Sequence, residues 1–335
     1  MGSYLKDKQK IFLLIRKNVP FVYFFYRLRF VVFISSTQWF MLWAILELNS
    51  IIFIPLLNKN KTSQEHGARL TYFLTQGTAS LLMIFSMFTL EVNNSREIQS
   101  PKILILLALI VKITRAPVHR WLPAIIVSLT RTNVWLVLTM QKLIPLMLLM
   151  LIKPNLNTIL ICCILISTTM GAIINLTQSN SKAILAYSRI SHAGWFMTAR
   201  RICQESWIFY FVSYTSLLFL LRMGLNITVG QHRIAVNQRN SALSLVTILS
   251  LGGLPPLMGF YPKAIIISSA IQMELNRLAL VIIVLSAVDV FVYIRLSYHA
   301  IMNKKSKILW LKKEKYFSIS IVIIINVVFS IIVIL

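Results

Sequence analysis

Long apolar runs separated by short polar stretches dominate the pattern of hydrophobic and polar positions along this chain. A run of about 20 apolar residues can cross a bilayer as an α-helix. The pattern predicts eleven such spans, at about 21–38, 39–57, 69–90, 102–125, 134–152, 157–177, 183–199, 206–225, 242–274, 277–300 and 316–335. The polar stretches leave no room for a large soluble domain. We therefore expect an all-α fold, a polytopic transmembrane helix bundle.

Two of the predicted spans contain residues that break a helix. Pro117 interrupts the span at 102–125. The segment 250–263, which reads SLGGLPPLMGFYPK, interrupts the span at 242–274 with Gly252, Gly253, Pro255, Pro256 and Pro262. Proline removes a backbone donor and frees a carbonyl. Non-helical backbone is tolerated at membrane depth only inside protein or beside a wet cavity, so we expect two broken helices within the bundle.

Composition agrees with a membrane protein and adds a strong positive charge. The 335 residues are 57% hydrophobic and 13% charged, with a mean hydropathy of +0.76, whereas soluble domains are about 45–50% apolar and about 25% charged. The formal net charge is +25, from 34 Lys and Arg against 9 Asp and Glu. No soluble module carries a basic patch, so we expect no nucleic-acid partner.

The basic residues divide unevenly between alternate loops, as the positive-inside rule predicts. One set of loops holds thirteen, namely Lys59, Lys61, Arg69, Arg131, Lys182, Arg233, Arg239, Lys304, Lys305, Lys307, Lys312, Lys313 and Lys315. The other set holds six, namely Arg96, Lys102, Lys153, Arg200, Arg201 and Arg277. This division favours an N-terminus on the side of synthesis. We expect residues 1–20 to form a basic N-terminal tail and residues 21–335 a single transmembrane domain.

The sequence offers no pattern for a metal or a cofactor. Of the three cysteines, Cys162 and Cys163 are adjacent inside a predicted span, and Cys203 lies in a loop. This arrangement predicts neither a four-thiolate iron–sulfur site nor a zinc ribbon. The sequence has no G-x-G-x-x-G motif and no P-loop, so no nucleotide site is expected.

Four ionisable residues lie at membrane depth, and three of them are lysines near proline or glycine: Glu47, Lys112, Lys142 and Lys263. A charge in hydrocarbon is costly, so each residue marks a functional site by default. A lone lysine near the end of a span can instead extend to the membrane interface. Together, the three lysines and the glutamate favour an internal path that holds and releases protons. Carboxylates are too few for a sodium or potassium site, which needs several oxygen ligands.

Two histidines and one aspartate are weaker candidates. His119 follows the first helix break, and His192 lies in LAYSRISHAGW. Each could be a member of the proton path or a hydrogen-bonded packing residue. Asp289 lies six residues before Arg295, which is off the i+4 spacing of a helical ion pair. A structural role is expected for Asp289.

Five segments carry a resemblance to a known family: WAILELNSIIFIPLL, KITRAPVHRWLP, TMQKLIP, LAYSRISHAGW and SLGGLPPLMGFYPK. In this order and at these spacings they resemble the chain 2 family of mitochondrial NADH:ubiquinone oxidoreductase, respiratory complex I. The resemblance covers roughly residues 30–300. The chain length and the eleven predicted spans suit the shortened animal form of this antiporter-like subunit.

The resemblance implies a core membrane-arm subunit that translocates protons in the mitochondrial inner membrane, with its N-terminus on the matrix side. It implies that Glu47 pairs with Lys112, that Lys142 is the central lysine, and that Lys263 is the terminal one. It also implies that this chain has no redox site, and that other subunits hold NADH, FMN, iron–sulfur clusters and ubiquinone. The implied partners are other membrane-arm subunits and the lipid bilayer, including cardiolipin.

Two other functions stay open from the residues alone. A cation/proton antiporter outside complex I would use the same lysines, and copurification with quinone-reducing subunits would exclude it. A non-pumping membrane scaffold would use the deep lysines only to pair with neighbouring chains. In a scaffold, lysine-to-methionine changes would damage assembly rather than turnover.

Six arginines at membrane depth depart from the pattern of the family: Arg27, Arg29, Arg115, Arg120, Arg189 and Arg222. The family has an uncharged residue at position 120 and serine at position 189, and it has glycine where Thr114 stands. Some mitochondrial codes read AGA and AGG as glycine or serine, so several of these arginines are expected to be artefacts of translation with the standard code. Genuine arginines that are paired in the assembled complex are the alternative. CGN codons for Arg115, Arg120 and Arg189 would contradict the artefact.

Overall fold

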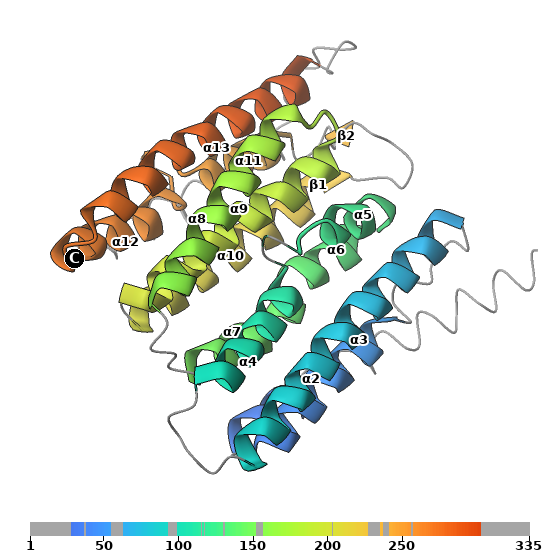
Figure 1. Cartoon of the computed structure of the whole chain (residues 1–335). Coiled ribbons are helices and arrows are strands. Elements are labelled where there is room, and N and C mark those ends of the chain that lie inside the picture. Colours follow the sequence, from blue (N-terminus) through green and yellow to red (C-terminus); the bar gives the residue numbers. More distant parts are fainter. Residues whose placement is uncertain are drawn as a thin grey trace, which may run out of the picture.

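A computed structural model describes residues 28–36, 38–54, 63–92, 99–114, 116, 118–129, 131–151, 157–202, 204–226, 235–236, 241–255 and 257–302. Its helices run side by side as one bundle (Figure 1). They are α2 (Trp39–Phe53), α3 (Ser63–Val92), α4 (Gln99–Ile113), α5 (Trp121–Ser128), α6 (Arg131–Leu138), α7 (Met140–Leu151), α8 (Asn157–Thr177), α9 (Ser181–Ile202), α10 (Gln204–Gly224), α11 (Ser241–Gly252), α12 (Phe260–Gln272) and α13 (Asn276–Met302). The predicted tail at 1–20 and the predicted span at 316–335 lie outside the described residues.

Five helical segments of the described part are long and apolar enough to cross a membrane: His66–Leu90, Asn133–Met150, Thr158–Thr177, Glu205–Met223 and Asn276–Tyr298. The predicted spans at 157–177, 206–225 and 277–300 are confirmed by α8, α10 and α13, whose ends differ from the predictions by at most two residues. Large apolar side chains such as Leu81, Phe85, Leu280 and Val284 point out of the bundle. This exposed apolar surface suits contact with lipid tails.

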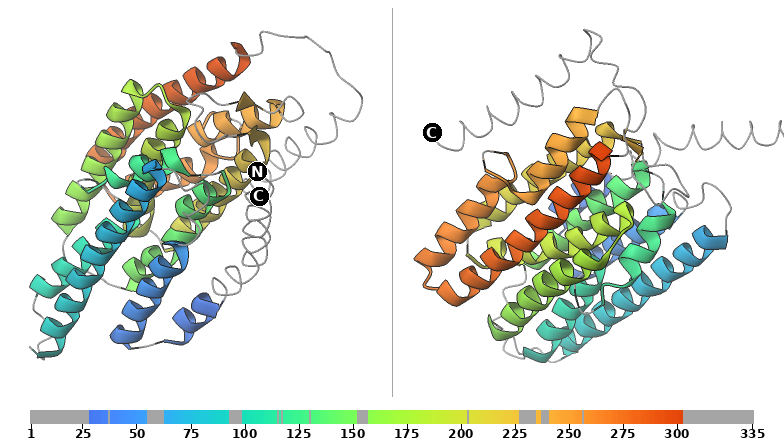
Figure 2. Two further views of the ribbon diagram at one scale, coloured as in Figure 1. Left: turned by 90° about the vertical axis from the view of Figure 1, so that its right-hand side faces the viewer. Right: turned by 90° about the horizontal axis from the view of Figure 1, so that it is seen from above.

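Helices that are distant in the chain pack together in the bundle, for example α13 against α8 and α4 against α7. Seen from above, α3 and the orange helices late in the chain lie on opposite sides (Figure 2), and the most buried helix is α9. Within α9 every residue is buried except Tyr187, Arg200 and Arg201. Helix α9 packs against α8, α10, α5, α12 and α13, so any polar group on α9 lies inside protein rather than in lipid.

The first break separates α4 from α5, as predicted within the span 102–125. Pro117 lies outside the described residues, but Thr114 ends α4 in a left-handed conformation, with φ of 65°. Its N–H donates to the carbonyl of Val111 at 3.1 Å. Left-handed residues commonly end helices and are usually glycine, and a β-branched residue there is strained. The glycine expected from the family at this position therefore has a physical reason.

The second break separates α11 from α12 and is also present as predicted. Gly253 has φ of +86°, a conformation that favours glycine. A Cβ on Gly259 would lie 1.7 Å from the carbonyl oxygen of Ser250, so the loop returns against the end of α11. Pro262 stands in the first turn of α12, where its missing N–H is tolerated. Pro255 lies in the turn between the helices, and Pro256 lies outside the described residues.

A further interruption, which we did not predict, divides the span at 134–152 into α6 and α7 at Thr139. Pro145, inside α7, has no N–H and therefore cannot donate to the carbonyl of Gln141, four residues earlier. The side chain of Asn49 on α2 donates to this freed carbonyl at 3.2 Å. In return, the Gln141 amide donates to the carbonyl of Asn49 at 3.3 Å. These reciprocal bonds join α2 to α7 across the bundle.

The described chain also contains two short strands, which the all-α prediction did not include. They are β1 (Leu225–Asn226) and β2 (Ala235–Val236). The strands pair antiparallel, with Leu225 opposite Val236 and Asn226 opposite Ala235. This pair follows α10 and does not change the helical architecture of the bundle.

Candidate functional site

All three lysines that we selected from the sequence are buried inside the bundle. The exposed fraction is 5% for Lys112, 1% for Lys142 and 6% for Lys263. None of them therefore extends to the membrane interface, which was the plainer interpretation of a lone lysine. Each lysine lies beside an interrupted helix: Lys112 near the end of α4, Lys142 near the start of α7, and Lys263 near the start of α12.

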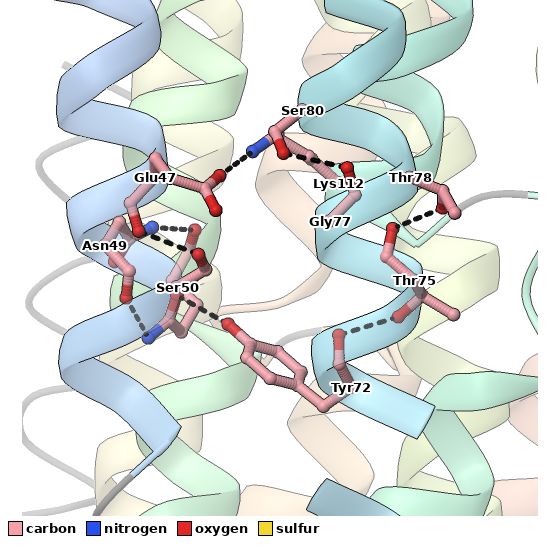
Figure 3. A network of polar contacts seen from close by, with 10 residues as sticks. Glu47, Asn49, Ser50, Tyr72, Thr75, Gly77, Thr78, Ser80 and Lys112 are labelled. Atoms are coloured by element: carbon pink, nitrogen blue, oxygen red, sulfur yellow. Dashed lines mark hydrogen bonds and ion pairs between the residues drawn. The ribbon is translucent and has the colours of Figure 1, made fainter. Parts of the chain in front are cut away.

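The ammonium of Lys112, on α4, faces the carboxylate of Glu47, on α2 (Figure 3). The Nζ–Oε2 distance is 3.9 Å, which is an ion pair but longer than a hydrogen bond. Among the described residues, neither of these two atoms has a hydrogen-bond partner. The side chain of Lys112 is 2% exposed and that of Glu47 is 25% exposed. The pair is therefore loose. Glu47 is its more exposed residue, although the paired Oε2 atom is itself buried.

The ammonium of Lys142 donates a hydrogen bond to the hydroxyl of Thr114. That hydroxyl donates in turn to the carbonyl of Ile113, the last residue of α4. The strained residue of the first break thus connects the central lysine to a backbone position next to Lys112. We did not predict this contact, because the glycine of the family has no hydroxyl. In the sequence, this contact could have been suspected from the threonine at position 114, where the family has glycine.

Lys112 and Lys142 line one internal cavity. Its polar lining also includes Asn49, Tyr72 and Gln141, and the Tyr72 hydroxyl donates to the Gln141 side-chain carbonyl at 3.3 Å. The cavity volume is about 10 Å³, close to what one water molecule needs when two to four polar partners surround it. The two amines therefore share a polar space inside the bundle.

The ammonium of Lys263 lies at the end of α11. It donates to the carbonyl of Gly252 at 2.8 Å and lies 5.5 Å from the ring centroid of Trp195. A cation is favoured at a helix C-terminus, where the macrodipole is negative. A Cβ on Gly253 would lie 3.1 Å from this ammonium, so the break has glycine where the lysine passes close to the backbone.

Both candidate histidines are buried, in different surroundings. His192 Nδ1 lies 2.6 Å from the Tyr210 hydroxyl, and its Nε2 lies 3.5 Å from the Tyr293 hydroxyl. His192 also borders a second cavity of about 10 Å³ near Gly259 and Pro262. His119, between α4 and α5, packs edge-on against Tyr187 with ring centroids 6.4 Å apart. His192 therefore has polar contacts at both ring nitrogens and lies near the second break, while His119 lies near the first.

Two buried charged residues make contacts that the sequence did not indicate. We counted Lys182 among the loop residues, but it lies in α9 and is 2% exposed. Its ammonium donates to the carbonyls of Val127 at 2.9 Å and Leu129 at 3.0 Å, which close the end of α5. Asp289 is 3% exposed and accepts a hydrogen bond from Ser191. No spacing along one helix could reveal these contacts, because they join different helices.

Arg295 does not pair with Asp289 in the described structure. Its guanidinium donates to carbonyls in the last turn of α8 and just after it, with a shortest distance of 2.7 Å to Leu176. The other two acceptors are Asn175 and Gln178. Arg295 therefore closes the C-terminus of α8, where a cation is favoured.

The arginines that depart from the family pattern have four different environments. Arg29 donates to the carbonyl of Met140 at 3.1 Å, Arg120 is exposed, and Arg222 lies 5.3 Å from the ring centroid of Trp135. Arg189 is fully buried between the rings of Phe196 and Tyr214, at 4.9 and 4.8 Å. No carboxylate in the described part of the chain forms an ion pair with Arg189. Arg27 and Arg115 lie outside the described residues.

Comparison with known structures supports the same fold. Residue-for-residue identity is low, but 92% of the chain superposes on 77% of a chain of "Respiratory complex I from Thermus thermophilus with bound Aureothin", with a TM-score of 0.76 and 21% identity. The membrane-bound sulfane sulfur reductase, an archaeal respiratory membrane complex, gives a TM-score of 0.77 over 92% of this chain and 72% of that chain, at 17% identity. A chain of the Mrp complex from Dietzia sp. DQ12-45-1b gives 0.69 over 77% of this chain and 56% of that chain, at 16% identity.

Sequence comparison identifies the family to which the chain belongs. Residues 36–288 match the family described as "NADH:quinone oxidoreductase/Mrp antiporter, TM". The chain is 31% identical to NADH-ubiquinone oxidoreductase chain 2 of Locusta migratoria, over 84% of this chain and 85% of that protein. It is 34% identical to the protein of the same name from Xenopus laevis, over 79% and 81%. The chain therefore belongs to the NADH-ubiquinone oxidoreductase chain 2 family, within the wider transmembrane family of NADH:quinone oxidoreductases and Mrp antiporters.

Proposed function

We propose that this chain, as a subunit of a proton-translocating NADH:ubiquinone oxidoreductase, carries protons along a path through Glu47, Lys112, Lys142, His192 and Lys263. The observation that carries the proposal is the cavity shared by Lys112 and Lys142, since both amines are buried and face a polar space rather than lipid. A charge that is kept inside a membrane bundle and faces a cavity is typical of a proton path.

The Glu47–Lys112 pair acts as the switch at one end of this path. The adjacent carboxylate stabilises the charged form of Lys112, while burial opposes it. Their 3.9 Å contact is not reinforced by a hydrogen bond between the two charged atoms. A small movement of the Glu47 carboxylate therefore changes how readily Lys112 releases its proton.

Lys142 receives the proton in the middle of the bundle, where two half-channels meet. A water molecule in the shared cavity would connect its amine with that of Lys112. The Thr114 hydroxyl holds the Lys142 ammonium at the end of α4. Because this hydroxyl can both donate and accept, it supports either protonation state of the lysine.

Lys263 forms the far end of the path, with His192 on the way to it. The two tyrosine hydroxyls around His192 give its ring a partner at each nitrogen. The carbonyl of Gly252 and the negative end of α11 hold the charged form of Lys263. His119, next to the first break, is proposed as an additional member of the path near Lys112.

The family also suggests the surroundings of this chain. We propose that it lies in the mitochondrial inner membrane with its N-terminus on the matrix side. In this proposal the chain has no redox site, and NADH, FMN, iron–sulfur clusters and ubiquinone are bound by other subunits. Its partners are other membrane-arm subunits and lipid, including cardiolipin. The chain resembles subunits of several multi-subunit respiratory complexes in fold, which supports a partner-bound state.

Replacing the central amine tests the proposed path. In the intact complex, we expect Lys142→Met to preserve assembly and NADH oxidation but to lower the number of protons translocated per NADH. Lys102→Met, at the partly exposed start of α4, makes the same replacement outside the path and should leave that number unchanged. Proton uptake by vesicles and native gels measure the two effects. Unchanged pumping in Lys142→Met would reject the path, and loss of assembly instead of pumping would favour a scaffold.

A further inference from the structure

Asp289 is the central residue of α13, and it points into the bundle. Each end of this helix is about 20 Å away, from the rise of 1.5 Å per residue. Asp289 is 3% exposed, whereas Val284 and Phe291, on the outer face of the same helix, are 57% and 58% exposed. A carboxyl group is therefore held inside protein, near the middle of a helix that is long and apolar enough to cross a membrane. Such a position is occupied by charged residues mainly where they have a function.

The carboxyl group of Asp289 has one occupied oxygen and one open oxygen. Ser191 on α9 donates to Oδ2. Oδ1 is buried, and no donor of the described residues reaches it. A buried carboxylate oxygen without a donor is unfavourable, so Oδ1 is a position at which a proton would be stabilised.

Lys263 is the buried cation that lies on the side of the bundle where Asp289 points. Its ammonium donates to the carbonyl of Gly252, and a Cβ on Gly252 would lie 3.4 Å from the ring of Tyr293, one turn after Asp289 on α13. The same ammonium lies 5.5 Å from the ring centroid of Trp195, one turn after Ser191 on α9, and no direct ion pair joins Lys263 and Asp289 among the described residues. The Lys263 ammonium has three donors and gives one to the carbonyl of Gly252. Its other donors are available for a partner on α13, which packs against α12.

Four polar residues from three helices complete the surroundings of Asp289. His192 and Ser191 are neighbours on α9, Tyr293 lies one turn along α13, and Tyr210 comes from α10. The hydroxyls of Tyr210 and Tyr293 both approach the ring of His192, at 2.6 and 3.5 Å. Asp289 therefore lies in the same polar cluster as His192, although Asp289 is not one of the residues of the proposed path.

We propose that Asp289 is the proton-exchange partner of Lys263, so that the far end of the path is a lysine–aspartate pair. This inference rests on the proposed function and adds a residue to it. Because the two groups form no direct ion pair, the exchange passes through a water molecule between them. One N–H bond of the Lys263 ammonium breaks and gives its proton to the water, and the water gives another of its protons to Asp289 Oδ1, where an O–H bond forms. A cation and an anion become a neutral amine and a neutral carboxylic acid. The total charge of the pair is unchanged, and a second proton that reaches Lys263 then releases the first from Asp289.

The main experiment compares single and double replacements in the intact complex. Asp289→Asn should lower the protons translocated per NADH as much as Lys263→Met does. If the two residues act as one pair, the double variant should lose no more than either single variant, because effects within a pair are not additive. Asp289→Glu, which keeps the carboxyl group, should retain most of the pumping. Ser286→Ala on the outer part of α13, where the hydroxyl donates to its own helix, should change nothing.

Several results would overturn this inference, and they differ from those that overturn the path. Normal pumping in Asp289→Asn together with reduced pumping in Lys142→Met and Lys263→Met would remove Asp289 and leave the path in place. Normal pumping in Lys142→Met would remove the path itself. Additive losses in the double variant would show that Asp289 and Lys263 act separately.

A failure of Asp289→Asn to assemble is also decisive. If the aspartate is the partner of Lys263, then removing both charges should restore assembly, since an unpaired buried charge is worse than none. A double variant that also fails to assemble would make Asp289 a structural residue and overturn the inference. In the parent complex, an infrared carboxylic-acid band that changes on reduction by NADH and shifts in Asp289→Glu would identify the exchanging group.

Discussion

The two helix breaks each place a lysine on the same side of the bundle as a carboxyl group, but they do so in different ways. At the first break, Lys112 meets Glu47 directly at 3.9 Å, and the Glu47 side chain is 25% exposed. At the second break, Lys263 and Asp289 are both buried, and no ion pair joins them among the described residues. The first break ends in a strained threonine, and the second in a glycine with φ of +86°.

This difference indicates how the charge state of the lysine at each break can be controlled. A partly exposed carboxylate side chain at the surface of the bundle can respond to a neighbouring chain. A buried pair has little screening, so its charge state depends on the groups that already surround it. We infer that the Glu47 end is suited to receive a signal, and that the Lys263 end is suited to hold a proton until another arrives.

The largest effect is expected from closing the space at the second break. Gly259→Ala would bring a Cβ within 1.7 Å of the Ser250 carbonyl oxygen, so α11 and α12 would have to separate. We expect a loss of stability of about 3 kcal/mol or more, at the upper end of overpacking effects, and little assembled complex. Gly77→Ala on α3 is the control, because no atom lies within 4 Å of its added Cβ. Native gels and thermal melting of the complex measure the outcome, and normal assembly of Gly259→Ala would contradict the tight return of the loop.

A smaller effect is expected from removing the carboxylate at the first break. Glu47→Gln keeps the shape but removes the charge opposite Lys112. Because the pair is loose and partly exposed, the charged form of Lys112 should be weakened by about 1 kcal/mol, roughly a fivefold change in its equilibrium. The rate of proton translocation under steady NADH oxidation should fall by a similar factor, and Glu47→Asp should recover part of it. A larger loss than in Asp289→Asn would reverse the proposed contrast between the ends.

The smallest effect on stability is expected at Thr114. Replacing it with glycine relieves a left-handed conformation that costs about 1–2 kcal/mol but also removes a hydrogen bond worth about 0.5–1.5 kcal/mol. Thr114→Gly should therefore melt close to the parent complex. Thr114→Val keeps the strain and loses the hydroxyl, so it should melt at the lowest temperature of the three. If valine and threonine melt alike, the contact between Lys142 and Thr114 contributes nothing.

The sequence was informative wherever a property is local to one segment. The apolar run at 157–177 coincides with α8, and the glycines and prolines around residue 255 predicted a broken helix that is present. The burial of Lys112, Lys142 and Lys263 also agrees with the interpretation of deep lysines as internal groups. Their roles in proton transfer stay predictions, because position alone does not show movement of a proton.

Contacts between helices could not be predicted, because they depend on how the helices pack. From the sequence we considered only Arg295, on the same helix, as an ion-pair partner of Asp289, whereas the structure shows a hydrogen bond from Ser191 on α9. Lys182 was counted as a loop charge, although it closes the end of α5. The freed carbonyl of Gln141 was foreseeable from Pro145, but its donor, Asn49, lies 92 positions earlier in the chain.

The hydrogen bond from Lys263 to Gly252 has a mechanical consequence. This ammonium fastens the start of α12 to the last carbonyl of α11. A neutral amine can still donate to that carbonyl, but it no longer attracts the negative end of the half-helix. In the proposed path, loss of the Lys263 proton would therefore weaken the attachment of α12 to α11, and return of the proton would strengthen it again.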